Sequence, residues 1–205
     1  MGRDSMLKQE ETRKEMSSVP KNKRNETKFE VEHHFYKLRS AITDLMLIDY
    51  GFSVEKYNKI IERYRENHSS ANNVEEVVAR YQKKCESFCR WFIDRENDTI
   101  LSMLRKICEE FTTANSIYPS DTPARIAEYC ERRLHLDNAI AACQTLKQEL
   151  QYVIVTLPVD NNKYVRLSDM IEKEIALLKA LRKSDNRFVK PNSPNGRKSK
   201  IKKTE

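Results

Sequence analysis

Hydrophobic residues recur at intervals of three and four along most of the chain, the spacing that places side chains on one face of an α-helix. The first such stripe consists of Val31, Phe35, Leu38, Ile42, Leu45 and Ile48. Gly51 should end this helix because glycine accepts a positive φ. Ser53 can cap a second helix, whose stripe is Tyr57, Ile60, Ile61 and Tyr64. We therefore predict a helical hairpin over residues 28–71.

The stripes that follow predict four more helices over residues 72–185. The first begins after Asn73 as N-cap, and the polar string Asp94–Asp98 separates it from the second. The third restarts at Thr122–Pro123, since threonine caps helices and proline suits the first helical position. Its period continues through Tyr152–Val155, which overrides the strand preference of those residues. With a last helix over 165–183, the pattern indicates an all-α protein built on an antiparallel four-helix bundle.

Composition supports the helical interpretation and excludes some classes of protein. Three Gly and six Pro among 205 residues, with 34% charged residues, leave little turn chemistry for a multistranded sheet. The apolar runs are much shorter than the roughly 20 residues that cross a bilayer, and the charged N-terminus lacks a signal-peptide core. We expect a cytoplasmic protein with no membrane partner.

Charge is concentrated at the two ends of the sequence. The last 24 residues contain nine Lys or Arg against two acids, and the first 28 contain eight against five. Since the whole chain is +7, the body between them is net −3. We predict disordered basic tails over 1–27 and 186–205, and we expect the C-terminal tail to bind a polyanion. The alternative is a solvated terminus that aids solubility.

Five cysteines, an odd number, lie within the apolar patterns at positions 85, 89, 108, 130 and 143. Cys85 and Cys89 are four apart, which is too wide for a zinc CxxC pair. We expect buried free thiols that act as small hydrophobic groups. His33 and His34 point about 100° apart on a helix, so a shared metal is not expected. Nothing in the sequence demands a cofactor.

Two stretches near the C-terminus resemble a known family. Residues 134–150 (LHLDNAIAACQTLKQEL), a short loop, residues 170–182 (MIEKEIALLKALR) and a basic end follow one another. This order resembles the last two helices of the accessory variability determinant proteins of diversity-generating retroelements. They belong to a wider four-helix-bundle family that includes proteins encoded by ribosomal RNA intervening sequences. The resemblance covers roughly residues 73–188.

The resemblance implies a non-enzymatic bundle that binds a reverse transcriptase and its template RNA. It also implies a homo-oligomer, because family members assemble as a pentameric barrel. RNA is the expected nucleic acid, with DNA or an RNA–DNA hybrid as the alternative. Its binding residues would be basic side chains on the polar faces of the bundle and in the tail: Arg125, Arg132, Arg133, Lys147, Arg166, Lys173, Lys179, Arg182, Lys183, Arg187, Lys190, Arg197, Lys198, Lys200, Lys202 and Lys203.

An enzymatic alternative rests on Arg63 and His68. Their R-x4-H spacing resembles the motif of HEPN ribonucleases, helical proteins that cleave RNA without a metal. Such a pair can stabilise charge and transfer a proton at a phosphodiester. The residue after the arginine is usually polar in that family, and here it is Tyr64. If the pair is not catalytic, Arg63 is a solvated surface charge and His68 is the residue that ends its helix. Trp91 and Phe92 could stack on bases, but beside Phe88 we expect both in the core.

Overall fold

The computed structural model describes residues 28–119 and 123–188, and every regular element in these ranges is helical. The elements are α2 (Lys28–Leu47), η2 (Asp49–Gly51), α3 (Val54–Asn67), α4 (Val74–Ser116), α5 (Arg125–Thr156), α6 (Asn162–Ser184) and η3 (Asp185–Phe188). The predicted all-α class is confirmed. The N-terminal tail at 1–27 and residues 189–205 of the C-terminal tail lie outside the described residues.

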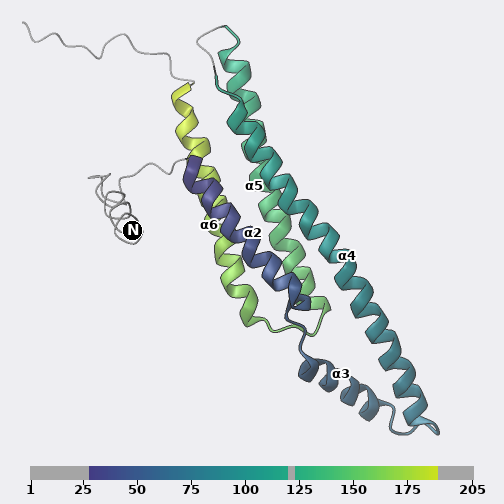
Figure 1. Cartoon of the computed structure of the whole chain (residues 1–205). Coiled ribbons are helices and arrows are strands. Elements are labelled where there is room, and N and C mark those ends of the chain that lie inside the picture. The colour runs from purple at the N-terminus through teal and green to yellow at the C-terminus, as the bar shows by residue number, and fades with distance from the viewer. Residues whose placement is uncertain (1–27, 120–122, 189–205) are drawn as a thin grey trace, which may run out of the picture.

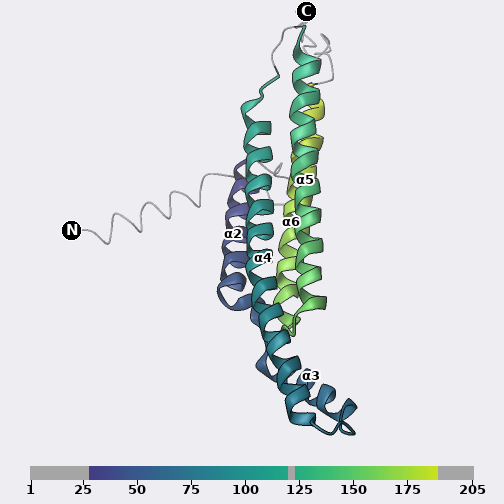
Figure 2. The same cartoon turned by 90° about the vertical axis from the view of Figure 1, so that its right-hand side faces the viewer.

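Four helices, α2, α4, α5 and α6, pack side by side as a bundle in which neighbours run antiparallel (Figures 1 and 2). The order around the bundle is α2, α4, α5, α6, with α4 and α5 sharing the most extensive interface. The core is continuous across all four helices. Its fully buried members include Leu38, Ile42, Ile100, Leu104, Ile107, Leu136, Leu146, Ile171 and Leu178.

The predicted break at Asp94–Asp98 is wrong, because α4 is one continuous helix of 43 residues. Within that polar string Glu96 is buried, in line with Phe92 and Ile100 of the core stripe. Asn97 is also engaged, since its Oδ1 accepts a hydrogen bond of 2.8 Å from the hydroxyl of Tyr50. Five consecutive polar residues are typical of a loop, but here the packing of the bundle buries Glu96, and Asn97 has a tertiary hydrogen-bond partner. Residues 72–185 therefore hold three helices rather than four.

The fourth helix of the bundle is α2, which the sequence pattern had assigned to a separate hairpin. Its stripe of Val31, Phe35, Leu38 and Ile42 is buried against the bundle, mainly against α6. The hairpin partner of α3 is instead the N-terminal part of α4. We call α3 and residues 74–90 of α4 the arm. It extends past the ends of α2, α5 and α6 (Figure 1). Its own small core consists of Tyr57, Ile61 and Val78.

A left-handed corner joins α2 to the arm. Asp49, Tyr50 and Gly51 have φ values of 48°, 59° and 74°, so the positive φ predicted for Gly51 is confirmed, although α2 already ends at Leu47. Tyr50 is fully buried, and its carbonyl accepts a 2.8 Å hydrogen bond from the hydroxyl of Tyr164. The amide of Ser53 donates to the carbonyl of Pro158 at 2.8 Å. These bonds connect the base of the arm to the α5–α6 loop and to the first turn of α6.

Some helix ends agree with the sequence, and others differ: Asn73 precedes α4 but makes no side-chain capping bond, and α6 begins at Asn162 rather than 165. Ser53 caps α3 as predicted, with its Oγ accepting from the amide of Lys56. The stretch 152–155 is helical, as predicted. However, α5 begins at Arg125 rather than Pro123, and the proposed cap Thr122 lies outside the described residues. In the part of the chain that the structure describes, no helix combines the length and apolarity required to cross a membrane.

Candidate nucleic-acid interface

The most basic helix of the bundle is α6. It contains six Lys or Arg against three Asp or Glu, and one of these acids, Glu174, is buried. It ends in η3, after which the sequence continues into the basic tail. The exposed face of α6 and the tail are thus consecutive in the chain and share one sign of charge. This arrangement favours an anionic ligand along this side of the bundle.

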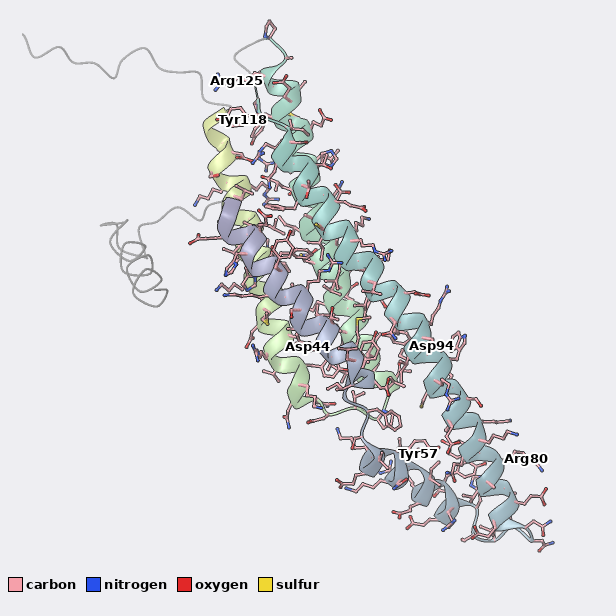
Figure 3. The ribbon with its side chains drawn as sticks, in the orientation of Figure 1. Asp44, Tyr57, Arg80, Asp94, Tyr118 and Arg125 are labelled. Carbon is pink, nitrogen blue, oxygen red and sulfur yellow. The ribbon has the colours of Figure 1, made fainter. Side chains whose placement is uncertain are left out.

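A groove between α2 and α6 gathers several of these charges. Its volume is about 570 Å³, and its cationic lining residues are Lys37, Lys163 and Arg166. Asp44, labelled in Figure 3, is the only acid among its lining residues. Lys173 lies two helical turns beyond Arg166 on the same face of α6. We call the surface formed by Lys37, Lys163, Arg166 and Lys173 the basic groove. Its concave, positively charged form suits a phosphate backbone.

A buried pair lies next to Lys37 and Lys173, where His34 of α2 meets Glu174 of α6. The Nδ1 of His34 is 2.6 Å from Oε2 of Glu174, whose side chain is 1% exposed. Burial raises the pKa of Glu174 to about 8. Burial, followed by the charges of Lys173 and Lys37, lowers the pKa of His34 below its ordinary value. Both shifts favour neutral forms, in which the protonated carboxyl donates to the imidazole. The pair therefore does not offset the positive charge of the groove.

The predicted binding residues fall into distinct groups. Arg166, Lys173, Lys179 and Lys183 of α6 are exposed and form no ion pair within the described ranges. Three others are paired: Lys147 with Glu172 at 2.5 Å, and Arg182 and Arg133 with Asp137. Arg125 lies with Tyr118 at the end of the bundle opposite the arm, which carries Tyr57 and Arg80 (Figure 3). Of the tail residues, Arg187 lies in η3, and Lys190, Arg197, Lys198, Lys200, Lys202 and Lys203 lie outside the described residues.

Arg132 is a correction, because it is not on a polar face. Its side chain is 8% exposed, and its Nε donates to Oδ2 of Asp185 at 2.6 Å. Its Nη1 donates to the carbonyls of Ala114 and Ile117, at 2.5 and 3.2 Å. Arg132 thereby ties α5 to the end of α4 and to η3. A guanidinium with all these partners inside the protein has a structural role and does not face a ligand.

The two residues of the ribonuclease alternative are on the arm. Arg63 is exposed on α3, and His68 is the C-cap of that helix. The Nδ1 of His68 is 2.8 Å from the carbonyl oxygen of Tyr64, and the two rings stack with centroids 4.1 Å apart. The imidazole of His68 is thus held at the end of its own helix, as expected if this histidine ends the helix and is not catalytic.

Sequence reasoning missed Lys37 and Lys163, and it misplaced several side chains besides Arg132, including Ile48 and Ile60, which are exposed. Both lysines belong to the basic groove only because α2 lies beside α6, a pairing that the hydrophobic pattern does not specify. Phe92 is buried as predicted, whereas Trp91 is 59% exposed. Among the cysteines, Cys143 is buried as predicted, but Cys130 is exposed.

Comparison with protein-family models, curated proteins and solved structures finds no match for this chain. Inference about its function therefore depends on the residues described above.

Proposed function

We propose that this protein is a non-enzymatic nucleic-acid-binding accessory protein that holds the RNA backbone with its basic groove and its C-terminal tail. The observation that supports this most directly is the convergence of Lys37, Lys163, Arg166 and Lys173 on one face of the bundle. Asp44 is the only acid among the residues that line the groove, and the neighbouring Glu174 is predominantly neutral below pH 8.

The dimensions of α6 suit a strand of nucleic acid. An α-helix rises about 1.5 Å per residue, so the 23 residues of α6 extend over roughly 35 Å. Phosphates follow one another at about 3.4 Å of axial rise in each strand of a duplex, so several can lie against such a length. Contacts of this kind position a backbone without reading its bases. The expected binding is therefore weakly dependent on sequence and strongly dependent on salt.

The sequence resemblance supplies a more specific proposal. By that resemblance, the ligand is a template RNA, the protein partner is a reverse transcriptase of a diversity-generating retroelement, and the chain forms a homo-oligomer. DNA or an RNA–DNA hybrid would engage the same backbone-binding surface. Co-purification of the protein with the reverse transcriptase, before and after nuclease treatment, tests whether the two proteins bind directly.

Salt dependence of RNA affinity tests the binding surface. For single-stranded RNA, each lysine or arginine that contacts a phosphate contributes about 0.7 to the log–log slope against salt. Replacing Arg166 and Lys173 together by alanine should lower the slope by about 1.4. Replacing the tail residues Arg187, Lys190, Arg197, Lys198, Lys200, Lys202 and Lys203 by serine should lower it by about 3 to 4, if five of the seven engage.

Lys147 provides the matched control, because its ammonium already pairs with Glu172 on the surface. Lys147→Ala removes one positive charge, as each substitution in the groove does, but it should leave the slope nearly unchanged. Equal effects of Lys147→Ala and of a groove substitution would mean that only net charge matters. Slopes unchanged in both the groove and the tail variants would contradict the proposal and leave these charges as solvated surface groups.

A further inference from the structure

An exposed aromatic cluster lies on the opposite side of the bundle from the basic groove, where α4 meets α5. It consists of Phe88 and Trp91 of α4 and Tyr152 of α5, which are 45%, 59% and 50% exposed. Because α2 and α6 form one side of the bundle and α4 and α5 the other, this surface and the basic groove face away from each other. We call Phe88, Trp91 and Tyr152 the aromatic face.

The rings of the aromatic face are supported from below. Phe92, which is 2% exposed, contacts Phe88 with ring centroids 5.8 Å apart and Tyr152 edge-on at 5.2 Å. Phe88 and Trp91 are 5.9 Å apart and tilted by 40°. A buried ring thus anchors exposed rings from two helices, which limits the side-chain entropy they lose on binding. Such a platform can accept flat ligands over its exposed π surfaces.

Cations flank the rings along α4. Lys84, Phe88, Trp91 and Arg95 are spaced by four, three and four residues and therefore share a stripe of the helix. Both cations are exposed, and within the described ranges neither forms an ion pair. Two acids of α4, Asp94 and Asp98, and Glu149 of α5 lie nearby in the helical register. The cations nevertheless bracket the two rings directly, an arrangement complementary to bases joined by phosphates.

We propose that the aromatic face binds the unstacked bases of a single-stranded nucleic acid, with Lys84 and Arg95 contacting the adjoining phosphates. This deepens the proposed function, on which it rests for the class of ligand. Base stacking on aromatic side chains tolerates any sequence because every base has a π face. It also requires single strands, since the bases of a duplex are already stacked. The aromatic face therefore selects single-stranded regions, whereas the basic groove contacts the backbone alone.

Trp91 is the only tryptophan of the chain, so its fluorescence reports on this surface alone. A uridine oligonucleotide should quench Trp91 emission saturably as a base stacks on the indole. A ribose-phosphate oligomer of the same length without bases, and heparin, present charge but no π face. Both should bind the protein without quenching. Quenching of equal size by heparin would mean that the indole responds to charge only, and the proposal would be overturned.

Substitution separates stacking from charge. Trp91→Ala should weaken binding of the uridine oligonucleotide by about 5- to 100-fold at unchanged salt slope, as expected for loss of one stacked base. Trp91→Phe keeps a ring and should retain most of the affinity, which also shows that the site is not lost through misfolding. Tyr36→Ala is the control, because Tyr36 is an aromatic residue on α2 with comparable exposure, 53%. It should leave the affinity unchanged.

Three outcomes would overturn the proposal in different ways. In the first, the oligonucleotide binds with the salt dependence expected of the groove and tail, but it does not change Trp91 emission, and Trp91→Ala binds it as tightly as the wild type does. Only the role of the aromatic face is then rejected. If Trp91 emission shifts with protein concentration in the absence of nucleic acid, a second copy of the chain covers the rings instead. Failure of the oligonucleotide to bind at any salt concentration would reject the proposed function together with this one.

Discussion

The bundle and the arm share helix α4, yet they are stabilised differently. In the bundle, α4 packs against α5 and α2, and Ile100 and Leu104 are fully buried in a core that continues into α6. In the arm, the main partner of residues 74–90 is α3, and the buried core consists only of Tyr57, Ile61 and Val78. Since the helix is continuous, the difference comes from the number of partners and not from helix-forming ability.

Polar groups differ between the two regions as well. The buried acidic and basic residues of the described chain, Glu96, Arg132, Glu174 and Asp185, all belong to the bundle or to the turn that follows it. The ion pairs of the arm, such as Arg65 with Glu75 at 3.0 Å, are exposed. Instead, the arm relies on aromatic contacts, chiefly Tyr64 stacked on Tyr81 with centroids 3.7 Å apart. Disruption of a single group should therefore cost the bundle far more than the arm.

The largest effect is expected from Glu174, measured across pH. Burial raises its pKa from 4.5 to about 8, a difference that corresponds to about 5 kcal/mol. The stability that the protonated form contributes is fully present below pH 4.5 and is lost as pH rises toward 8. Glu174→Gln keeps the shape and a hydrogen-bond donor for His34 without an ionisable proton. Its free energy of unfolding relative to the wild type should rise over this range and level off above pH 8.

Denaturant unfolding at several pH values measures this difference. His34, whose pKa is lowered, contributes stability that is lost as pH falls below about 6.5, but it is present in both proteins and cancels in the comparison. Glu109→Gln, at an exposed position of α4, is the control and should follow the wild type at every pH. A pH-independent difference between Glu174→Gln and wild type would show that the carboxyl is already ionised in the folded protein.

The next largest effect is expected from Arg132. Arg132→Ala would leave Asp185 buried without its partner, which typically destabilises a protein by about 3–5 kcal/mol. Arg133 is its neighbour in sequence but is exposed, so Arg133→Ala should leave the unfolding midpoint nearly unchanged. Replacing both Arg132 and Asp185 by leucine should recover part of the loss, since no buried charge remains. Similar midpoints for the two alanine variants would contradict a structural role for Arg132.

The smallest of these effects is local and separates the arm from the bundle. Tyr64→Ala removes the stacking on Tyr81 and should cost about 1–2 kcal/mol, from the ring pair and part of its buried area. Because few contacts join the arm to the bundle core, hydrogen exchange should accelerate in residues 54–90 only. Leu104→Ala, at a fully buried bundle position, should instead accelerate exchange throughout α2, α4, α5 and α6. Uniform acceleration by Tyr64→Ala would mean that the two regions unfold as one unit.

The sequence by itself determined the local structure of this protein. Helical periodicity and capping depend on residues within a few positions of one another, so Ser53 and Gly51 could be assigned from the pattern. The candidate interface was partly predictable for the same reason. Arg166, Lys173, Lys179 and Lys183 lie opposite the apolar stripe of α6, and such residues are exposed whatever the stripe packs against.

Only the tertiary structure decided which helices share a core. An apolar stripe shows that one face of a helix is buried, but it does not identify the partner, so the packing of α2 on α6 could not be read from it. Long-range contacts also decided that Glu96 and Arg132 are buried in the bundle. The free energy of burying a charged side chain depends on its neighbours in space, which are distant in the sequence. Trp91 is exposed because it lies outside the face of α4 that packs against α5 and α2, a face to which its neighbour Phe92 belongs.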